Sequence, residues 1–492
     1  MRSQARVRHP CRRSRALKGL RSLPSALCFD GMSDPADLTI SEAGRLLRAR
    51  SLSPVDLIEA VLARIAARNP RYNAFLSVDE DAVRSEARDA EAAFCSGDVR
   101  GPLHGIPYGV KDIVDVRGET TTCNSRVRGY HMADADADIV GRLRGSGAIL
   151  IGKLALHEFA RGGAMWDLPW PPARNPWDPD RHPGGSSSGS GAAVAAGMLP
   201  AAIGTDTGGS VRHPATACGI VGLKPTYDAI SRRGIFPLAF SLDTVGLLTR
   251  TVEDNALLFH AARAPYNGGS RNERDCLHHL WDGIRGLRIG LVEHFYVSDV
   301  EAHSDFQAAM EGAVDVLRSL GAEVARIQLS PLPLWTACGQ AILQSESYVV
   351  HEAWLRERPQ DYSSDCRAKL LVGRFVPASK YLKAQQMRAV LIAEFEAAMR
   401  EVDIVVTLSS MDPPARIDDR AEVARTYARH ARMPFNLTGT PAMSVPIGLS
   451  AEGLPIGMQI AGRAFDEATV YRVGWAYCAA SGSTELRPPM RD

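Results

Sequence analysis

One stretch, residues 182–226, is dense in glycine, serine and threonine and also carries the apolar residues of a folded core. Flexible Gly/Ser linkers lack apolar residues, whereas here they fill Ala192 to Leu199 and Ile220 to Leu223. A loop of small residues inside core-forming sequence lets backbone amides approach a small group closely. The Ala-rich helix after it would aim unpaired N–H groups into that loop, which suits an anion or oxyanion. The stretch therefore predicts a reactive loop built into a folded domain.

Three common enzyme motifs do not account for this loop. A phosphate-binding P-loop needs Gly-Lys-Ser/Thr, and the lysine is missing. Gly185 to Gly189 matches the G-x-S-x-G nucleophile elbow, which requires a strand directly before it. Residues 175–183 contain three prolines and cannot form a central strand. A zinc site of the HExxH type is also excluded, because His157-Glu158 lacks the second histidine.

Composition narrows the class of protein. The chain has 492 residues, 45% of them hydrophobic, with a net charge of +1, so it can bury a large core without disulfides or a metal. The small net charge argues against nucleic-acid binding, and no apolar run reaches the ~18 residues of a membrane span. Nine scattered cysteines without a CxxC indicate reduced thiols. We therefore expect a cytoplasmic enzyme without metal, cofactor, nucleic-acid or membrane partner; a homodimer is left open.

The N-terminus differs from the rest of the chain. Residues 1–31 contain eight basic residues and a single acid, Asp30. Such composition is typical of twin-arginine signals and transit peptides, but Arg21 and Pro24 interrupt the apolar stretch that export requires. We expect a disordered tail that ends near Met32, and we divide the chain into an extension, residues 1–36, and one domain, residues 37–492.

Apolar periodicity predicts an α/β fold. Ser53 and Pro54 begin a helical pattern that Asn69-Pro70 is expected to end. Helical patterns alternate with short apolar runs typical of buried strands, which predicts a sheet with helices on both faces. The expected strands are 148–151, 287–292, 404–407 and 443–447, the expected long helices are 302–320 and 379–400, and the expected linker is 265–285.

Several motifs, in one order along the chain, resemble the amidase signature family. They are GIPYGVKD at 105–112, GGSS at 184–187, GTDTGGSVRHPA at 204–215, CGIVGLKPT at 218–226, and further matches at 236–243, 249–254, 434–441 and 453–460. The resemblance spans about residues 37–480. It implies a single large α/β domain with a mixed central sheet covered by helices on both faces.

The resemblance also implies a catalytic triad. Ser210 matches the family's nucleophile, Ser186 the bridging serine that follows a cis peptide bond, and Lys111 the catalytic base. The chemistry is consistent, because a serine hydroxyl needs an adjacent base and a lysine is a base only when burial lowers its pKa. Lys111 lies between Val110 and Ile113 in an apolar run, so burial is expected.

The remaining site residues surround this triad. We expect the oxyanion to bind the backbone N–H groups of Thr207, Gly208, Gly209 and Ser210. Ser187 is expected to support the site by hydrogen bonding, and Asp206 and Arg212 to form a structural ion pair. The expected pocket wall is the loop 161–170, with Trp166 and Trp170, together with region 330–400. His213 is interpreted as a hydrogen-bonded loop histidine; facing the pocket, it would favour a polar or anionic acyl group.

These residues predict an amidase that hydrolyses a linear carboxylic amide (a C–N bond other than a peptide bond) to a carboxylate and ammonia or an amine. Two alternatives remain: the A subunit of a tRNA-dependent glutamine amidotransferase, and a catalytically idle binding member. Intact Lys111, Ser186 and Ser210 argue against the second. The sequence carries no readable code for which small-molecule amide is the substrate.

Overall fold

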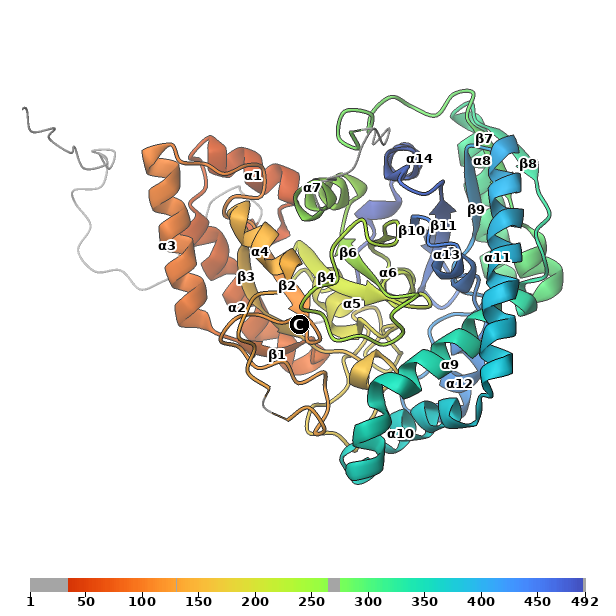
Figure 1. The fold of residues 1–492 in the computed structure, drawn as a ribbon. Helices are drawn as coiled ribbons and strands as arrows, with labels where there is room; N and C mark the ends of the chain where they lie inside the picture. Colours follow the sequence, from red (N-terminus) through yellow and green to blue (C-terminus); the bar gives the residue numbers. More distant parts are fainter. Residues whose placement is uncertain (1–33, 130, 264–274, 490–492) are drawn as a thin grey trace, which may run out of the picture.

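The computed structural model describes residues 34–129, 131–263 and 275–489, and it centres on one mixed sheet (Figure 1). Its strand order is β1-β3-β2-β4-β6-β5-β10-β11-β9-β7-β8. β2 pairs in parallel with β3 and β4, and β7 with β8 and β9, whereas the other pairs are antiparallel. The strands are β1 (Phe75–Val78), β2 (Pro107–Lys111), β3 (Ile149–Leu154), β4 (Ala201–Asp206), β5 (Val221–Lys224), β6 (Thr244–Thr249), β7 (Arg288–Leu291), β8 (Glu323–Arg326), β9 (Ile404–Leu408), β10 (Ala442–Leu449) and β11 (Pro455–Ala461).

Helices cover both faces of this sheet, as expected. The α-helices are α1 (Ile40–Arg48), α2 (Pro54–Tyr72), α3 (Glu80–Ser96), α4 (Asp138–Gly145), α5 (Ser188–Ala195), α6 (Arg212–Cys218), α7 (Val252–Ala262), α8 (Ser304–Ser319), α9 (Leu332–Glu357), α10 (Ser364–Leu371), α11 (Ala378–Glu401), α12 (Arg420–Tyr427), α13 (Met433–Leu437) and α14 (Glu467–Ser481). Short 3-10 or π turns lie at Pro35–Asp37, Glu158–Ala160, Phe295–Asp299, Pro359–Asp361, Val372–Phe375 and Ser483–Glu485. Among the described helices, none combines the length and hydropathy that crossing a membrane requires.

The two faces of the sheet bury separate apolar clusters. In β3, Ile149 and Ile151 belong to one cluster, together with residues of α2 and α5, whereas Leu150 belongs to the other, with residues of α4 and α7. Successive strand residues point to opposite faces, so a strand covered on both sides must be continuously apolar. This explains why the predicted strands were visible as short apolar runs: β3, β7, β9 and β10 confirm all four.

A further group of helices lies at one end of the sheet (Figure 1). α9 packs against α10, α11 and α13, and α12 contributes lining residues to the same cavity as α9 and α10. The two long helical patterns are confirmed as α8 and α11. Residues of α9, α10 and α12 form part of the wall of the main cavity.

Two boundaries differ from expectation. α2 continues through Pro70 to Tyr72, because a proline in the last turn removes only one hydrogen bond; the helix ends where Asn73 adopts a left-handed conformation with φ 49°. Packing also begins at Asp34 rather than at residue 37. Asp34 and Asp37 both pair with Arg64 of α2, whose guanidinium is buried. The predicted tail, residues 1–31, lies outside the described residues, as do residues 265–274 of the predicted linker.

Two truncations test this boundary. A chain beginning at Met32 is expected to keep the melting temperature to within about 1 °C and the full turnover rate, because it retains both partners of Arg64. Removal of residues 1–37 should lower the free energy of unfolding by roughly 1–3 kcal/mol, since it leaves a buried guanidinium without its carboxylates. Thermal and urea unfolding of the two truncated proteins would check this. A clear loss of stability in the first would show that the tail contributes to the fold.

Candidate active site

Lys111 lies at the carboxyl end of β2, between the parallel neighbours β3 and β4. Its side chain is fully buried, and its Nζ donates 2.8 Å hydrogen bonds to the Oγ of Ser186 and to the Oγ1 of Thr205. Burial lowers the pKa of Lys111 to about 7, although the Asp243 and Asp206 carboxylates act in the opposite direction. The lysine is therefore available as a neutral base near pH 7.

Ser186 and Ser187 occupy the turn that leads into α5, and both are fully buried. The Gly185–Ser186 peptide bond is cis, as the resemblance implies. A side chain at position 185 would overlap the imidazole of His157, so glycine is required there. The Oγ of Ser187 donates to the carbonyl of Thr205 at 3.2 Å and accepts from the N–H of Thr205 at 3.3 Å. This exchange ties the serine turn to β4, which is the supporting contact that the sequence predicts for Ser187.

The loop from β4 to α6 carries Ser210, and Asp206 organises it. The Asp206 carboxylate accepts from the N–H groups of Gly209 (2.8 Å) and Val211 (3.1 Å). It also forms a fully buried ion pair with Arg212 at 2.9 Å. Burial alone would raise the pKa of Asp206, but the Arg212 guanidinium outweighs it and holds the pKa well below the usual range. Asp206 and Arg212 thus form the expected ion pair, and it shapes the loop.

The structure corrects the expected role of Gly209. Its N–H donates to Asp206, so this group is not free to bind an oxyanion. Gly209 has a φ of 119°, and a side chain there would overlap Arg432, so the glycine makes room for a protein side chain. By contrast, the N–H groups of Thr207, Gly208 and Ser210 have no protein acceptor among the described residues. Sequence reasoning failed here because Arg432 is 223 positions away from Gly209 in the chain.

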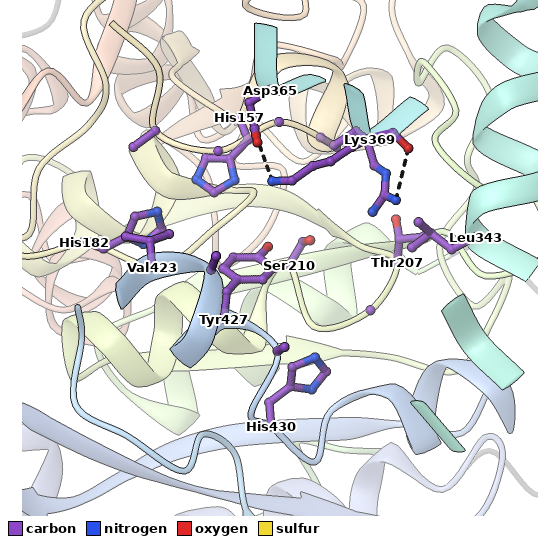
Figure 2. Close-up of a pocket in the computed structure, with 18 of the residues that line it drawn as sticks. His157, His182, Thr207, Ser210, Leu343, Asp365, Lys369, Val423, Tyr427 and His430 are labelled. Atoms are coloured by element: carbon purple, nitrogen blue, oxygen red, sulfur yellow. Dashed lines mark hydrogen bonds and ion pairs between the residues drawn. The ribbon is translucent and has the colours of Figure 1, made fainter. Parts of the chain in front are cut away.

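A cavity of about 420 Å³ opens over Ser210, and Thr207 and Gly208 also line it (Figure 2). Its walls come from residues 161–165 and from α9, α10 and α12. The position of loop 161–170 and region 330–400 was therefore predicted correctly in part. The prediction that Trp166 and Trp170 line the pocket was wrong, because neither is among the lining residues that the structure describes. Trp166 is 54% exposed and packs under the Arg174 guanidinium instead.

Several buried histidines surround the site. His157, His182 and His430 line the cavity (Figure 2), and burial lowers the pKa of each, that of His182 to about 4. His213 does not line the main cavity; its Nδ1 accepts from the N–H of Gly185 at 3.3 Å, and it faces a smaller cavity. It is thus a hydrogen-bonded loop histidine. No group of three His, Cys, Asp or Glu side chains in the described ranges is arranged to hold a metal.

Tyr427, at the end of α12, was not predicted. Its hydroxyl donates to the carbonyl of Gly185 at 3.3 Å, and Figure 2 shows its side chain next to that of Ser210. Tyr427 therefore holds the serine turn through its hydroxyl and lines the cavity together with Ser210. In the sequence, Tyr427 is a single tyrosine in a polar helix more than 200 residues from Ser210, and no pattern marks it.

We expect Tyr427→Phe to lower kcat about tenfold, because the hydrogen bond to Gly185, which holds the serine turn beside Ser186, is lost while the ring still fills its space. Steady-state kinetics together with a thermal melt would measure this. Tyr362→Phe is the matched control: that hydroxyl is also buried but is bonded to His351, and Tyr362 does not line the main cavity. Equal losses of rate in the two variants would contradict a role for Tyr427 in the active site.

Known proteins resemble this chain over most of its length. The sequence model of the family described as Amidase matches residues 56–471. The A subunit of the glutamyl-tRNA(Gln) amidotransferase from Roseiflexus sp. (strain RS-1) is 37% identical over 473 residues, which cover 89% of this chain and 96% of that protein.

Solved structures agree with this similarity. The native peptide amidase from Stenotrophomonas maltophilia has a TM-score of 0.81 and 28% identity, covering 92% of this chain and 98% of that one. A 6-aminohexanoate cyclic dimer hydrolase complexed with substrate has a TM-score of 0.81 and 27% identity, covering 92% and 99%. The motifs, the fold and these similarities lead to one conclusion: the chain is a member of the amidase family.

Proposed function

We propose that this protein is an amidase that hydrolyses a carboxylic amide through an acyl-Ser210 intermediate. The observation that carries the proposal is the buried Lys111, whose Nζ lies 2.8 Å from the Oγ of Ser186 and whose pKa is lowered to about 7. The two serine segments are joined directly, because the N–H of Ser187 donates to the carbonyl of Ser210 at 3.2 Å. A base, a bridging hydroxyl and a nucleophile are thus held by adjacent segments.

In the acylation step, neutral Lys111 accepts the proton of Ser186 while Ser186 accepts the proton of Ser210. The Oγ of Ser210 forms a bond to the amide carbonyl carbon. We assign stabilisation of the oxyanion to the N–H groups of Thr207, Gly208 and Ser210, which have no backbone acceptor among the described residues. The C–N bond then breaks, and the proton returns through Ser186 to the leaving nitrogen, which departs as ammonia or an amine. Water, deprotonated along the same path, attacks the acyl-enzyme and releases the carboxylate with Ser210 restored.

A second candidate function follows from the similarity to the A subunits of amidotransferases, at 37% identity. In that case glutamine would be the amide, and partner subunits and tRNA would take part. The net charge of +1 gives this chain no basic excess of its own for binding nucleic acid. We therefore favour a stand-alone amidase that acts on a small-molecule amide, in the cytoplasm.

Assays on the purified full chain separate these functions. The protein would be tested against aliphatic, aromatic and ureido amides and against glutamine, with and without a B subunit from a related organism. Turnover of a non-glutamine amide by the chain alone supports the proposal, whereas glutamine hydrolysis that depends on the B subunit supports the second candidate. Labelling by a fluorophosphonate probe that Ser210→Ala abolishes would exclude an idle binding member. An unlabelled and inactive wild-type protein would overturn both enzymatic functions.

A further inference from the structure

The charged side chains that line the main cavity are mostly cationic. They are Arg161, Lys369 and Arg420 against a single carboxylate, Asp365. Lys369 and Asp365 form an ion pair at 2.8 Å (Figure 2), so they largely neutralise each other. The lining histidines do not add charge, because burial lowers the pKa of each one. The cavity therefore has an excess of positive charge that no acid of its own wall balances.

Arg161 is one of the cations in the cavity wall that no acid of the wall balances. Its Nε is buried without a hydrogen-bond partner among the described residues, and one of its terminal nitrogens makes only a long hydrogen bond, 3.5 Å, to the carbonyl of Lys369. No carboxylate in the described part of the chain lies within ion-pair distance of it, although Asp365 acts to raise its pKa from farther away. A guanidinium stays protonated in proteins, and Arg161 is half-buried with its Nε lacking an acceptor, so the protein compensates its charge poorly. Such a group indicates an anion that is supplied from outside the chain.

The position of Arg161 relates it to the nucleophile. Arg161, Tyr427 and Ser210 all line the main cavity, and Figure 2 shows the Tyr427 and Ser210 side chains next to each other. Arg161 and the nucleophile thus belong to the wall of one cavity. Apolar side chains line the space around these polar groups, namely Met165, Leu343, Val423 and Met433. They would contact a short aliphatic chain between an anionic end and the amide.

We infer that the substrate is an amide that bears a carboxylate, with the carboxylate bound by Arg161 and the amide carbonyl placed over Ser210. This inference rests on the proposed function and specifies its substrate class. A carboxylate is favoured because the planar guanidinium matches it with two parallel hydrogen bonds. The volume of about 420 Å³ suits a small molecule. Monoamides of short dicarboxylic acids, with a carboxylate at one end and an amide at the other, have this form.

The test compares charged substrates with neutral ones of the same shape. Malonamate, succinamate and glutaramate would each be paired with the amide in which an isopropyl group replaces the carboxylate. For wild type we expect kcat/KM to be at least tenfold higher for the best charged substrate than for its neutral partner. Arg161→Met should lower this charged-to-neutral ratio about 10- to 100-fold, mainly through KM, and Arg161→Lys should restore part of it. Arg420→Met, at an exposed position on the rim, should change the ratio only a few-fold.

Binding to an inactive protein keeps this inference separate from the proposed function. The same carboxylates would be titrated into Ser210→Ala and into Ser210→Ala combined with Arg161→Met, by calorimetry. Binding to the first that weakens at least tenfold in the second supports the carboxylate site whether or not Ser210 is the nucleophile. Equal binding to both proteins, or no binding of any of these carboxylates to Ser210→Ala, overturns it. An equal loss of kcat/KM for charged and neutral substrates in Arg161→Met also overturns the carboxylate site.

Discussion

Replacing Ser210 by alanine is expected to abolish amide hydrolysis, with a loss in kcat of at least roughly 10³-fold. The substitution removes only the oxygen that attacks the carbonyl. Ser210 lies in a loop whose shape is fixed by Asp206 through backbone N–H groups and Arg212, and none of these contacts involves the Ser210 hydroxyl. The fold should therefore be retained, with a melting temperature within about 2 °C of wild type. Turnover of the best amide substrate, measured beside a thermal melt, checks both expectations.

The neighbouring serines provide matched controls. Ser186→Ala should be less damaging than Ser210→Ala, because a water molecule can relay the proton in place of the bridging hydroxyl. Ser187→Ala should act mainly on stability, since the Ser187 hydroxyl bonds to the backbone of Thr205 and to no catalytic group among the described residues. Retention of more than a few per cent of turnover by Ser210→Ala would sink its assignment as nucleophile. A Ser187→Ala variant that is stable and fully inactive would also contradict the assignment of Ser210 as the nucleophile.

The features that could be predicted from the sequence were mostly those set by contiguous residues. Strands buried on both faces, such as β3 and β9, are apolar over most of their length, and this signal survives without knowledge of their neighbours. The positions of Lys111, Ser186 and Ser210 came from motifs of contiguous residues, and the structure brings Lys111 and Ser186 into contact.

What could not be predicted depends on contacts between distant segments. The glycine at 209 makes room for Arg432, and Tyr427 reaches Gly185 from the far end of the chain. The loop at 161–170 was placed near the pocket, but which of its side chains face inward depends on packing. Arg161 and Met165 line the cavity, whereas Trp166 packs against Arg174 outside it. A large aromatic residue was a reasonable candidate from composition, but its orientation was decided by an arginine eight residues further on.

Loss of the base Lys111 is also expected to lower the rate strongly. Because burial lowers the pKa of Lys111 to about 7, kcat/KM should rise with pH as the lysine loses its proton and level off above about pH 8. Lys111→Ala should lose most of the rate, about 10²- to 10⁴-fold, and the pH dependence with it. Lys111→Arg should be no better, since a guanidinium stays protonated. Rates measured from pH 5 to 10 on the purified variants would show this.

Lys224 is the matched control for Lys111. It is equally buried and its pKa is also lowered to about 7 by burial, but its Nζ donates to the carbonyl of Pro225 and, within the described residues, to no serine of the site. Lys224→Met should therefore keep the pH profile of wild type. His182→Ala and His213→Ala should keep it as well, because neither imidazole is bonded to a site serine in the described ranges. Loss of activity in a histidine variant while Lys111→Ala keeps it would show that the base is a histidine.

Removing the Lys111 amine should change stability in the opposite direction from activity. In the unfolded chain a lysine keeps its ordinary pKa, whereas in the folded protein the pKa of Lys111 is about 7. Between these two pKa values the unfolded state binds a proton that the folded state does not, so this group makes the free energy of unfolding rise with pH across that window. The cost of burying the lysine is therefore greatest below pH 7.

Lys111→Met removes this cost and keeps the length of the side chain. Its free energy of unfolding in urea should exceed that of wild type by roughly a few kcal/mol at pH 6, and the difference should narrow towards pH 10. A variant that is inactive yet more stable at pH 6 would show that the fold maintains an unfavourable buried amine for its reactivity. A stability difference between Lys111→Met and wild type that stays the same from pH 6 to pH 10 would show that the pKa of Lys111 is not lowered in the folded protein, and a neutral base would then be excluded.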